Sequence, residues 1–200
     1  MSFIHFLSAL DPKMQLLLAV ILITTSIAYV LSLYKSNRHQ RRRKKATQIA
    51  NKLKTFSEAG QILTYLRKID PFVFEEMLLN AFEACGYKVI RNKRYTGDGG
   101  IDGQVIYEGK RIPVQAKRYA HHINKAHMVA FTEVTHKRRA PFGLFIHTGQ
   151  TGKGSYEVAT QDTPILIISG DRLIRLIKED QPYITDLLNS FYHQHRPITD

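Results

Sequence analysis

The longest apolar stretch runs without a charged residue from Met14 to Tyr34, and leucine, isoleucine, valine and alanine dominate its 21 residues. As a helix it would span about 31 Å at roughly 1.5 Å per residue, which matches the hydrocarbon core of a bilayer. Buried helices are rarely apolar on every face, and signal-peptide cores are shorter. The pattern predicts a short tail at residues 1–13 and a transmembrane helix at 14–34. A signal peptide cleaved after Ala28 is the alternative.

After this stretch, helical and extended spacings of apolar residues alternate. Asp70 and Pro71 are typical of a helix start, and Gly86 is typical of a helix end. Strand patterns cover 87–92, 101–107, 111–117, 143–148 and 164–169, and helical patterns cover 46–69, 71–85, 123–139, 155–160, 171–179 and 183–195. This order predicts an α/β fold in which a mixed sheet has helices on both faces.

The register of the first hairpin follows from its apolar alternation. Pairing Gln104 with Pro113 gathers the apolar side chains of both strands on one face, whereas a shift by one residue mixes the faces. The apolar face then holds Ile101, Val105, Tyr107, Ile112 and Val114. The same register places Asp102 opposite Gln115, on one face with Lys117.

Two helical patterns predict which side chains point inward. In residues 71–85, Glu75 continues the line of Leu79 and Phe82, so we expect it at the edge of a buried face. In residues 123–139, the spacing predicts that the inward side chains are Ala126, Val129, Ala130 and Val134.

Charge is concentrated just after the apolar stretch. The chain carries a formal net charge of +12, and seven lysines and arginines lie in residues 35–45. The positive-inside rule therefore places the chain after Tyr34 in the cytoplasm and the N-terminus outside, across an inner or plasma membrane. Anionic lipid headgroups are the simplest partner of the basic run, with DNA as a secondary one. The single cysteine excludes a disulfide framework and a cysteine-based zinc site.

One polar cluster has the chemistry for phosphodiester hydrolysis, which needs a hard cation, an activated water and charge neutralisation. Asp102 offers a carboxylate, Gln115 an amide oxygen and Ala116 its backbone carbonyl as metal ligands. Lys117 can orient the water and offset phosphate charge, and Glu75 can approach from its helix. By spacing alone, a surface ion pair between Asp102 and Lys117 is an equal alternative.

The segments FEEMLLNAFEACGYKV, GDGGIDGQVI and VQAKRY occur in this order. Together they resemble the Mrr-type branch of the PD-(D/E)XK nucleases, the type IV restriction endonucleases, over about residues 70–178. The resemblance implies an α/β/α restriction-endonuclease-like core that cleaves double-stranded DNA with Mg²⁺, for which Mn²⁺ can substitute. It also implies that Asp102, Gln115 and Lys117 are catalytic and that Glu75 assists them.

Residues outside this set are further candidates for DNA contact or metal binding. Arg118, Tyr119 and Lys153 are candidates for DNA-backbone contacts, as is the basic run at 137–139, for which a solvated helix end is an equal alternative. Asp98 is better interpreted as a turn residue than as a metal ligand. The role of His147, at a position where the family more often has a small hydroxyl residue, is left open.

The sequence therefore predicts a basic juxtamembrane segment at 35–45, a helical connector at 46–69, a nuclease domain at 70–178 and a C-terminal helix and tail at 179–200. We expect a membrane-anchored endonuclease that restricts foreign or modified DNA, with a homodimer also considered. The alternatives are a repair or recombination nuclease, a catalytically idle module that tethers DNA, and a purely structural membrane protein.

Overall fold

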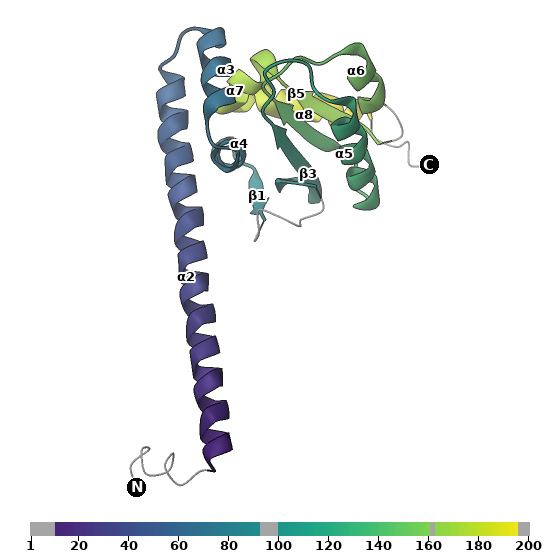
Figure 1. Cartoon of the computed structure of the whole chain (residues 1–200). Helices are drawn as coiled ribbons and strands as arrows, with labels where there is room; N and C mark the ends of the chain where they lie inside the picture. Colours follow the sequence, from purple (N-terminus) through teal and green to yellow (C-terminus); the bar gives the residue numbers. More distant parts are fainter. Residues whose placement is uncertain (1–10, 93–99, 161–162, 196–200) are drawn as a thin grey trace. The chain divides into compact units, whose positions relative to one another are not determined.

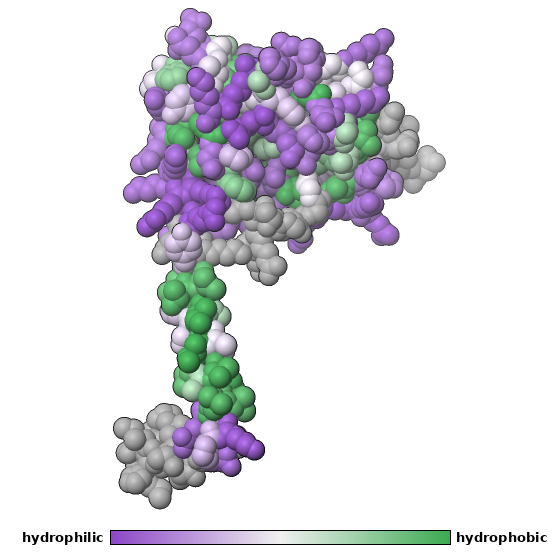
Figure 2. Space-filling model, viewed as in Figure 1, coloured by the Kyte–Doolittle hydropathy of each residue, from purple (hydrophilic) through white to green (hydrophobic). Residues whose placement is uncertain are grey.

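The computed structural model describes residues 11–92, 100–160 and 163–195, and the chain divides into two units, Met1–Arg41 and Arg42–Asp200 (Figure 1). The first unit contains the greater part of helix α2 (Pro12–Lys54). Among the described helices, α2 is the one long and apolar enough to cross a membrane, and the apolar window lies near the N-terminus with its side chains exposed (Figure 2). Within it, the Thr24 and Thr25 hydroxyls donate to the Ile21 carbonyl oxygen, so the backbone satisfies both polar groups.

The second unit begins earlier than the predicted domain. Helix α2 continues without a break to Lys54, and Ala46, Ile49, Ala50 and Leu53 on its last turns are buried in the core. Helix α3 (Ala59–Lys68) follows and buries Ile62 and Leu66. Residues 46–69, expected to be a connector, are therefore part of the packed domain.

The remaining elements form a five-stranded sheet with helices on both faces. They are α4 (Pro71–Ala84), β1 (Lys88–Arg91), β2 (Gly103–Tyr107), β3 (Lys110–Lys117), α5 (Lys125–Lys137), β4 (Gly143–His147), α6 (Lys153–Ala159), β5 (Ile165–Ile168), α7 (Gly170–Ile177) and α8 (Gln181–Gln194). The strand order is β1-β2-β3-β4-β5, with β1 to β3 antiparallel and β3 to β5 parallel. One core cluster joins the sheet to the end of α2 and to α3, α4, α7 and α8, and the other joins it to α5 and α6. The predicted α/β/α architecture with a mixed sheet is confirmed.

Two of these features, the start of α4 and the register of the hairpin, agree with the sequence prediction. The Asp70 carboxylate accepts a hydrogen bond from the Val73 N–H at 3.1 Å, and Pro71 occupies the first position of α4. In the hairpin, Gln104 pairs with Pro113, so the predicted register is confirmed. The face prediction fails at Ile101, which precedes β2 and packs in the cluster with α5 and α6.

The predicted inward face of α5 is wrong at three of its four residues, while the fourth, Val134, is half-buried against the second core cluster. The buried residues are Met128, Phe131 and Thr135, whereas Ala126, Val129 and Ala130 are exposed. The ring centroids of Phe131 and Phe145 on β4 lie 5.7 Å apart. The helix turns its larger apolar side chains to the sheet because they bury more surface than the alanine and valine stripe.

The loops that follow β3 and β4 are tied together beyond the ends of their strands. The Gln150 N–H donates to the His121 carbonyl at 3.0 Å, and the Ile123 N–H donates to the Gln150 carbonyl at the same distance. Gly149 lies at the tightest point, where an added Cβ would be 2.3 Å from the His121 carbonyl oxygen and 2.7 Å from Tyr119 Cβ. Glycine is required here because a backbone oxygen cannot move aside cheaply.

We expect Gly149→Ala to destabilise the domain by about 2–3 kcal/mol, since the new methyl group overlaps the His121 carbonyl oxygen and Tyr119 Cβ. Denaturant unfolding of the purified chain in detergent, followed by circular dichroism, measures the loss. Gly60→Ala is the matched control, because nothing lies within 4 Å of its added Cβ in α3. Equal stabilities of the two variants would contradict the close approach of the loops.

Candidate active site

The predicted site lies where β2 begins and β3 ends. Asp102 is half-buried just before β2, one residue beyond the last pair of the ladder, Gly103 with Val114. One Asp102 carboxylate oxygen accepts a hydrogen bond from the Ala116 N–H at 2.7 Å. This bond fixes Asp102 against the end of β3, although the predicted Asp102–Gln115 pair lies outside the ladder.

Gln115 has an oxygen that the described part of the chain leaves without a partner. Its Nε2 donates to the Gly100 carbonyl at 2.7 Å, which fixes the orientation of the amide. Its Oε1 is buried and accepts no hydrogen bond from any described residue. Buried polar atoms are rarely left unpaired, so this oxygen is suited to a ligand that the protein itself does not supply.

Glu75 reaches the same region from α4. Its pKa is raised to about 8, first by burial and then by the negative charge of Asp102, against the lowering effect of the Lys117 ammonium. Glu75 and Asp102 also border a cavity of about 20 Å³, room for one water molecule or ion. Two carboxyl groups that oppose each other's ionisation are typical of a site completed by a cation.

The sequence missed the more deeply buried glutamate of this helix. Glu76 is 3% exposed, and its carboxylate lies 2.9 Å from Arg91 Nε on β1. The same guanidinium contacts Asn80 and Glu83, so it ties the first strand to α4. No periodic pattern points to this pair; the only signal is an arginine in a predicted strand that directly follows a helix with three glutamates.

Of the three candidate DNA contacts, Arg118 and Tyr119 contact other residues of the protein, whereas Lys153 is exposed. Arg118 Nη1 donates to the carbonyls of Arg67, at 3.1 Å, and Ile69, so the guanidinium holds the end of α3. The Tyr119 hydroxyl contacts His127 Nδ1 on α5. Lys153 is exposed at the start of α6, at the same end of the sheet as Lys117.

One other candidate lies elsewhere. The run at 137–139 begins at the last residue of α5, where Lys137 and Arg139 share a cavity with Lys110, the first residue of β3. It therefore does not lie beside the site. Asp98 lies outside the described residues.

The donor set fits a cation that prefers oxygen ligands. Among residues 11–92, 100–160 and 163–195, no three histidine, cysteine, aspartate or glutamate side chains are grouped to hold a metal ion. The predicted set differs in kind, since it combines the Glu75 and Asp102 carboxylates with an amide and a backbone carbonyl. The buried, unpaired Gln115 oxygen is the feature of this set that fits Mg²⁺ best.

Comparison with known families matches residues 66–177 to the Mrr catalytic domain, a restriction endonuclease. The chain belongs to the Mrr-type restriction endonuclease family. It is also 27% identical, over 137 residues, to the type IV methyl-directed restriction enzyme EcoKMrr of Escherichia coli K12. That match covers 65% of this chain and 45% of the relative, so the chain spans less than half of the relative's length. No solved structure gives a significant match.

In this Mrr-type domain, His147 is a buried neutral residue. It is fully buried at the end of β4, and desolvation lowers its pKa to about 4. Its Nδ1 accepts a hydrogen bond from the Gly149 N–H at 3.2 Å, and its Nε2 lies 3.0 Å from the Thr151 hydroxyl. The ring therefore orders the loop after β4.

We expect His147 to make the folded domain less stable as the pH is lowered from 7 to 4. The unfolded chain binds the proton near pH 6.5 and the folded chain only near pH 4, so protonation favours unfolding between these values. The full loss corresponds to about 3 kcal/mol. Denaturant unfolding at pH 7 and pH 4 should show a smaller loss for His147→Gln than for the unmodified chain. Identical losses would contradict a neutral buried imidazole.

Proposed function

We propose that the chain is a membrane-anchored, Mg²⁺-dependent DNA endonuclease that restricts foreign or modified DNA. The observation that carries the proposal is the unpaired, buried Gln115 oxygen, one residue from the Ala116 N–H that holds the Asp102 carboxylate, within the segment matched to the Mrr catalytic domain. Neither a DNA tether nor a structural membrane protein needs a buried oxygen left unpaired one residue from the backbone N–H that holds Asp102.

Each site residue has a separate role in this proposal. Asp102, Glu75, the Gln115 oxygen and the Ala116 carbonyl would hold Mg²⁺, and Mn²⁺ would suit the same oxygen donors. The bound cation would neutralise phosphate charge and favour ionisation of a water molecule. Lys117 is not a ligand, because an ammonium has no lone pair. It would orient the attacking water and offset charge that develops on the phosphate.

Two features support the proposed context. The relative that the chain matches is a methyl-directed restriction enzyme, which makes methylated DNA the first substrate to test. The apolar part of α2, followed by the basic residues 35–45, is consistent with one membrane span that leaves the nuclease domain in the cytoplasm. A tether of this kind raises the local concentration of enzyme near entering DNA without any new contact.

We expect Asp102→Asn and Lys117→Ala to abolish cleavage by different routes. The amide can still accept the Ala116 hydrogen bond, so the fold persists while metal affinity falls, and excess Mg²⁺ restores part of the activity. Lys117→Ala leaves metal binding intact and lowers the single-turnover rate by about 10²–10³. Calorimetric Mg²⁺ titration of the detergent-purified chain, beside cleavage of methylated and unmethylated plasmid, separates the two routes.

Lys88→Ala on β1 and Asp171→Asn on α7 are the matched controls, since both side chains are exposed and outside the site. Both should cleave at the unmodified rate. If Lys117→Ala also does so, the assigned site is wrong, and Asp102 and Lys117 form only an ion pair.

The proposed topology has its own test. A reporter that is active only in the cytoplasm, fused after Asp200, should be active, because the basic residues follow the apolar segment. Activity of an extracytoplasmic reporter at the same point would reverse the orientation. A mature chain that begins after Ala28 would replace the membrane anchor with a cleaved signal peptide.

A further inference from the structure

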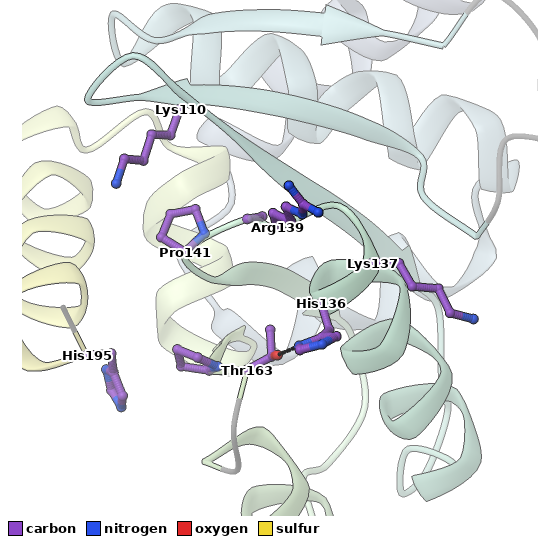
Figure 3. A pocket seen from close by; sticks show the side chains of 9 residues that line it. Lys110, His136, Lys137, Arg139, Pro141, Thr163 and His195 are labelled. Atoms are coloured by element: carbon purple, nitrogen blue, oxygen red, sulfur yellow. Dashed lines mark hydrogen bonds between the residues drawn. The ribbon is translucent and has the colours of Figure 1, made fainter. Parts of the chain in front are cut away.

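A large basic cavity lies at the end of the sheet opposite the candidate active site. Its volume is about 830 Å³, within the range of roughly 300–1,000 Å³ that small-molecule sites occupy. Its polar lining consists of Lys110, His136, Lys137, Arg139, Thr163 and His195 (Figure 3). Strand β3 runs from Lys110 at this cavity to Lys117 at the site, about 23 Å at roughly 3.3 Å per residue.

The lining has the charge of an anion site. Lys110, Lys137 and Arg139 line the cavity together with two imidazoles, although the Lys137 side chain points away from the other lining residues (Figure 3), and the described lining residues include no aspartate or glutamate. His136 Nδ1 lies 3.1 Å from the Thr163 hydroxyl, which fixes the ring and leaves its Nε2 for another partner (Figure 3). Pro141 and Pro164 add apolar wall.

Helix electrostatics account for part of this charge. His136 and Lys137 lie in the last turn of α5, where cations interact favourably with the helix dipole. Lys110 enters from β3 and packs over the Tyr192 ring, 5.8 Å from its centroid. Arg139 lies beyond the helix. The dipole therefore does not explain why these two cations line the cavity.

Arg139 occupies a backbone position that normally belongs to glycine. It has a φ of 52°, and the Arg139 N–H to His136 and Ala140 N–H to Thr135 hydrogen bonds close a Schellman motif around it. Gly86 holds the equivalent position after α4, with Gly86 to Glu83 and Tyr87 to Phe82 bonds. A side chain at this position costs stability that glycine would not.

A third helix end shows how such a cost can be offset. Glu179, with a φ of 59°, has the same position after α7, and its carboxylate lies 2.7 Å from Lys54 Nζ. The exposed Arg139 guanidinium has no hydrogen bond or ion pair with any described residue, although it lines a cavity with other cations. A bound anion would offset both the backbone cost and the repulsion between the cations.

We propose that this cavity binds a compact phosphate-bearing ligand of the nucleoside diphosphate class. The Arg139 guanidinium fork suits the paired oxygens of a diphosphate, and Lys110 and His136 line the same cavity. The proline and imidazole walls can pack against a sugar and base. Duplex DNA fits less well, because its phosphates lie on a convex cylinder whereas these cations line a hollow. The inference does not depend on the proposed nuclease activity.

The test uses the full chain in detergent, with EDTA present so that no divalent cation binds at the candidate active site. Fluorescence anisotropy of N-methylanthraniloyl-ADP measures binding, and inorganic pyrophosphate and ADP should displace the probe. Arg139→Gly should weaken binding by about tenfold or more, the loss of one charge-assisted contact. Its melting temperature should equal or exceed that of the unmodified chain, because glycine removes the left-handed strain.

Three variants control this result. Glu179→Gly relieves the same backbone strain elsewhere, and Arg138→Gln removes a neighbouring charge that does not line the cavity, so both should bind the probe as the unmodified chain does. Asp102→Asn should also bind it normally. The proposal is overturned if the probe does not bind, if Arg139→Gly binds normally, or if Asp102→Asn abolishes binding. Displacement by a DNA duplex or phosphatidylglycerol vesicles but not by pyrophosphate would likewise overturn it.

Discussion

Two hydrogen bonds between the start of β2 and the end of β3 are the constraint on which the candidate site depends. The Asp102 carboxylate accepts from the Ala116 N–H, and the Gln115 amide donates to the Gly100 carbonyl. Each bond joins a site side chain to the backbone of the facing segment, so both side chains are oriented before any ligand binds. The register of the hairpin therefore determines which oxygens face the Glu75 carboxyl.

That register could be predicted because the hairpin has one strongly apolar face. Val105, Ile112 and Val114 are each at most 1% exposed, so a shift by one residue would bring polar side chains into the core. The start of α4 was equally predictable, since Asp70 and Pro71 act within one turn of helix. Prediction failed on α5, where two apolar stripes compete. Met128 and Phe131 are buried because they fill the space over Phe145 on β4, which the sequence of α5 does not reveal.

The least predictable contacts join elements that are distant in sequence. Glu76 and Arg91 meet because α4 packs across β1, and Arg118 meets the Ile69 carbonyl because the end of α3 approaches the end of β3. Neither contact leaves a periodic trace in the sequence. The same holds for the start of the domain, where the basic run and the core-forming turns belong to one continuous helix.

Arginines and lysines near the candidate site differ in the contacts that they make within the protein. At the candidate site, Arg67, Arg91 and Arg118 are used for the fold, because a planar guanidinium can hold several fixed acceptors at once. The ammonium groups of the lysines at the same end, Lys117 and Lys153, make no hydrogen bond or ion pair with a described residue, and the proposed function assigns them to phosphates. Arg139 departs from this division, since its guanidinium has no acceptor among the described residues. Its exposed guanidinium is thus open to the paired acceptor oxygens of a phosphate, which is the ligand proposed for the basic cavity.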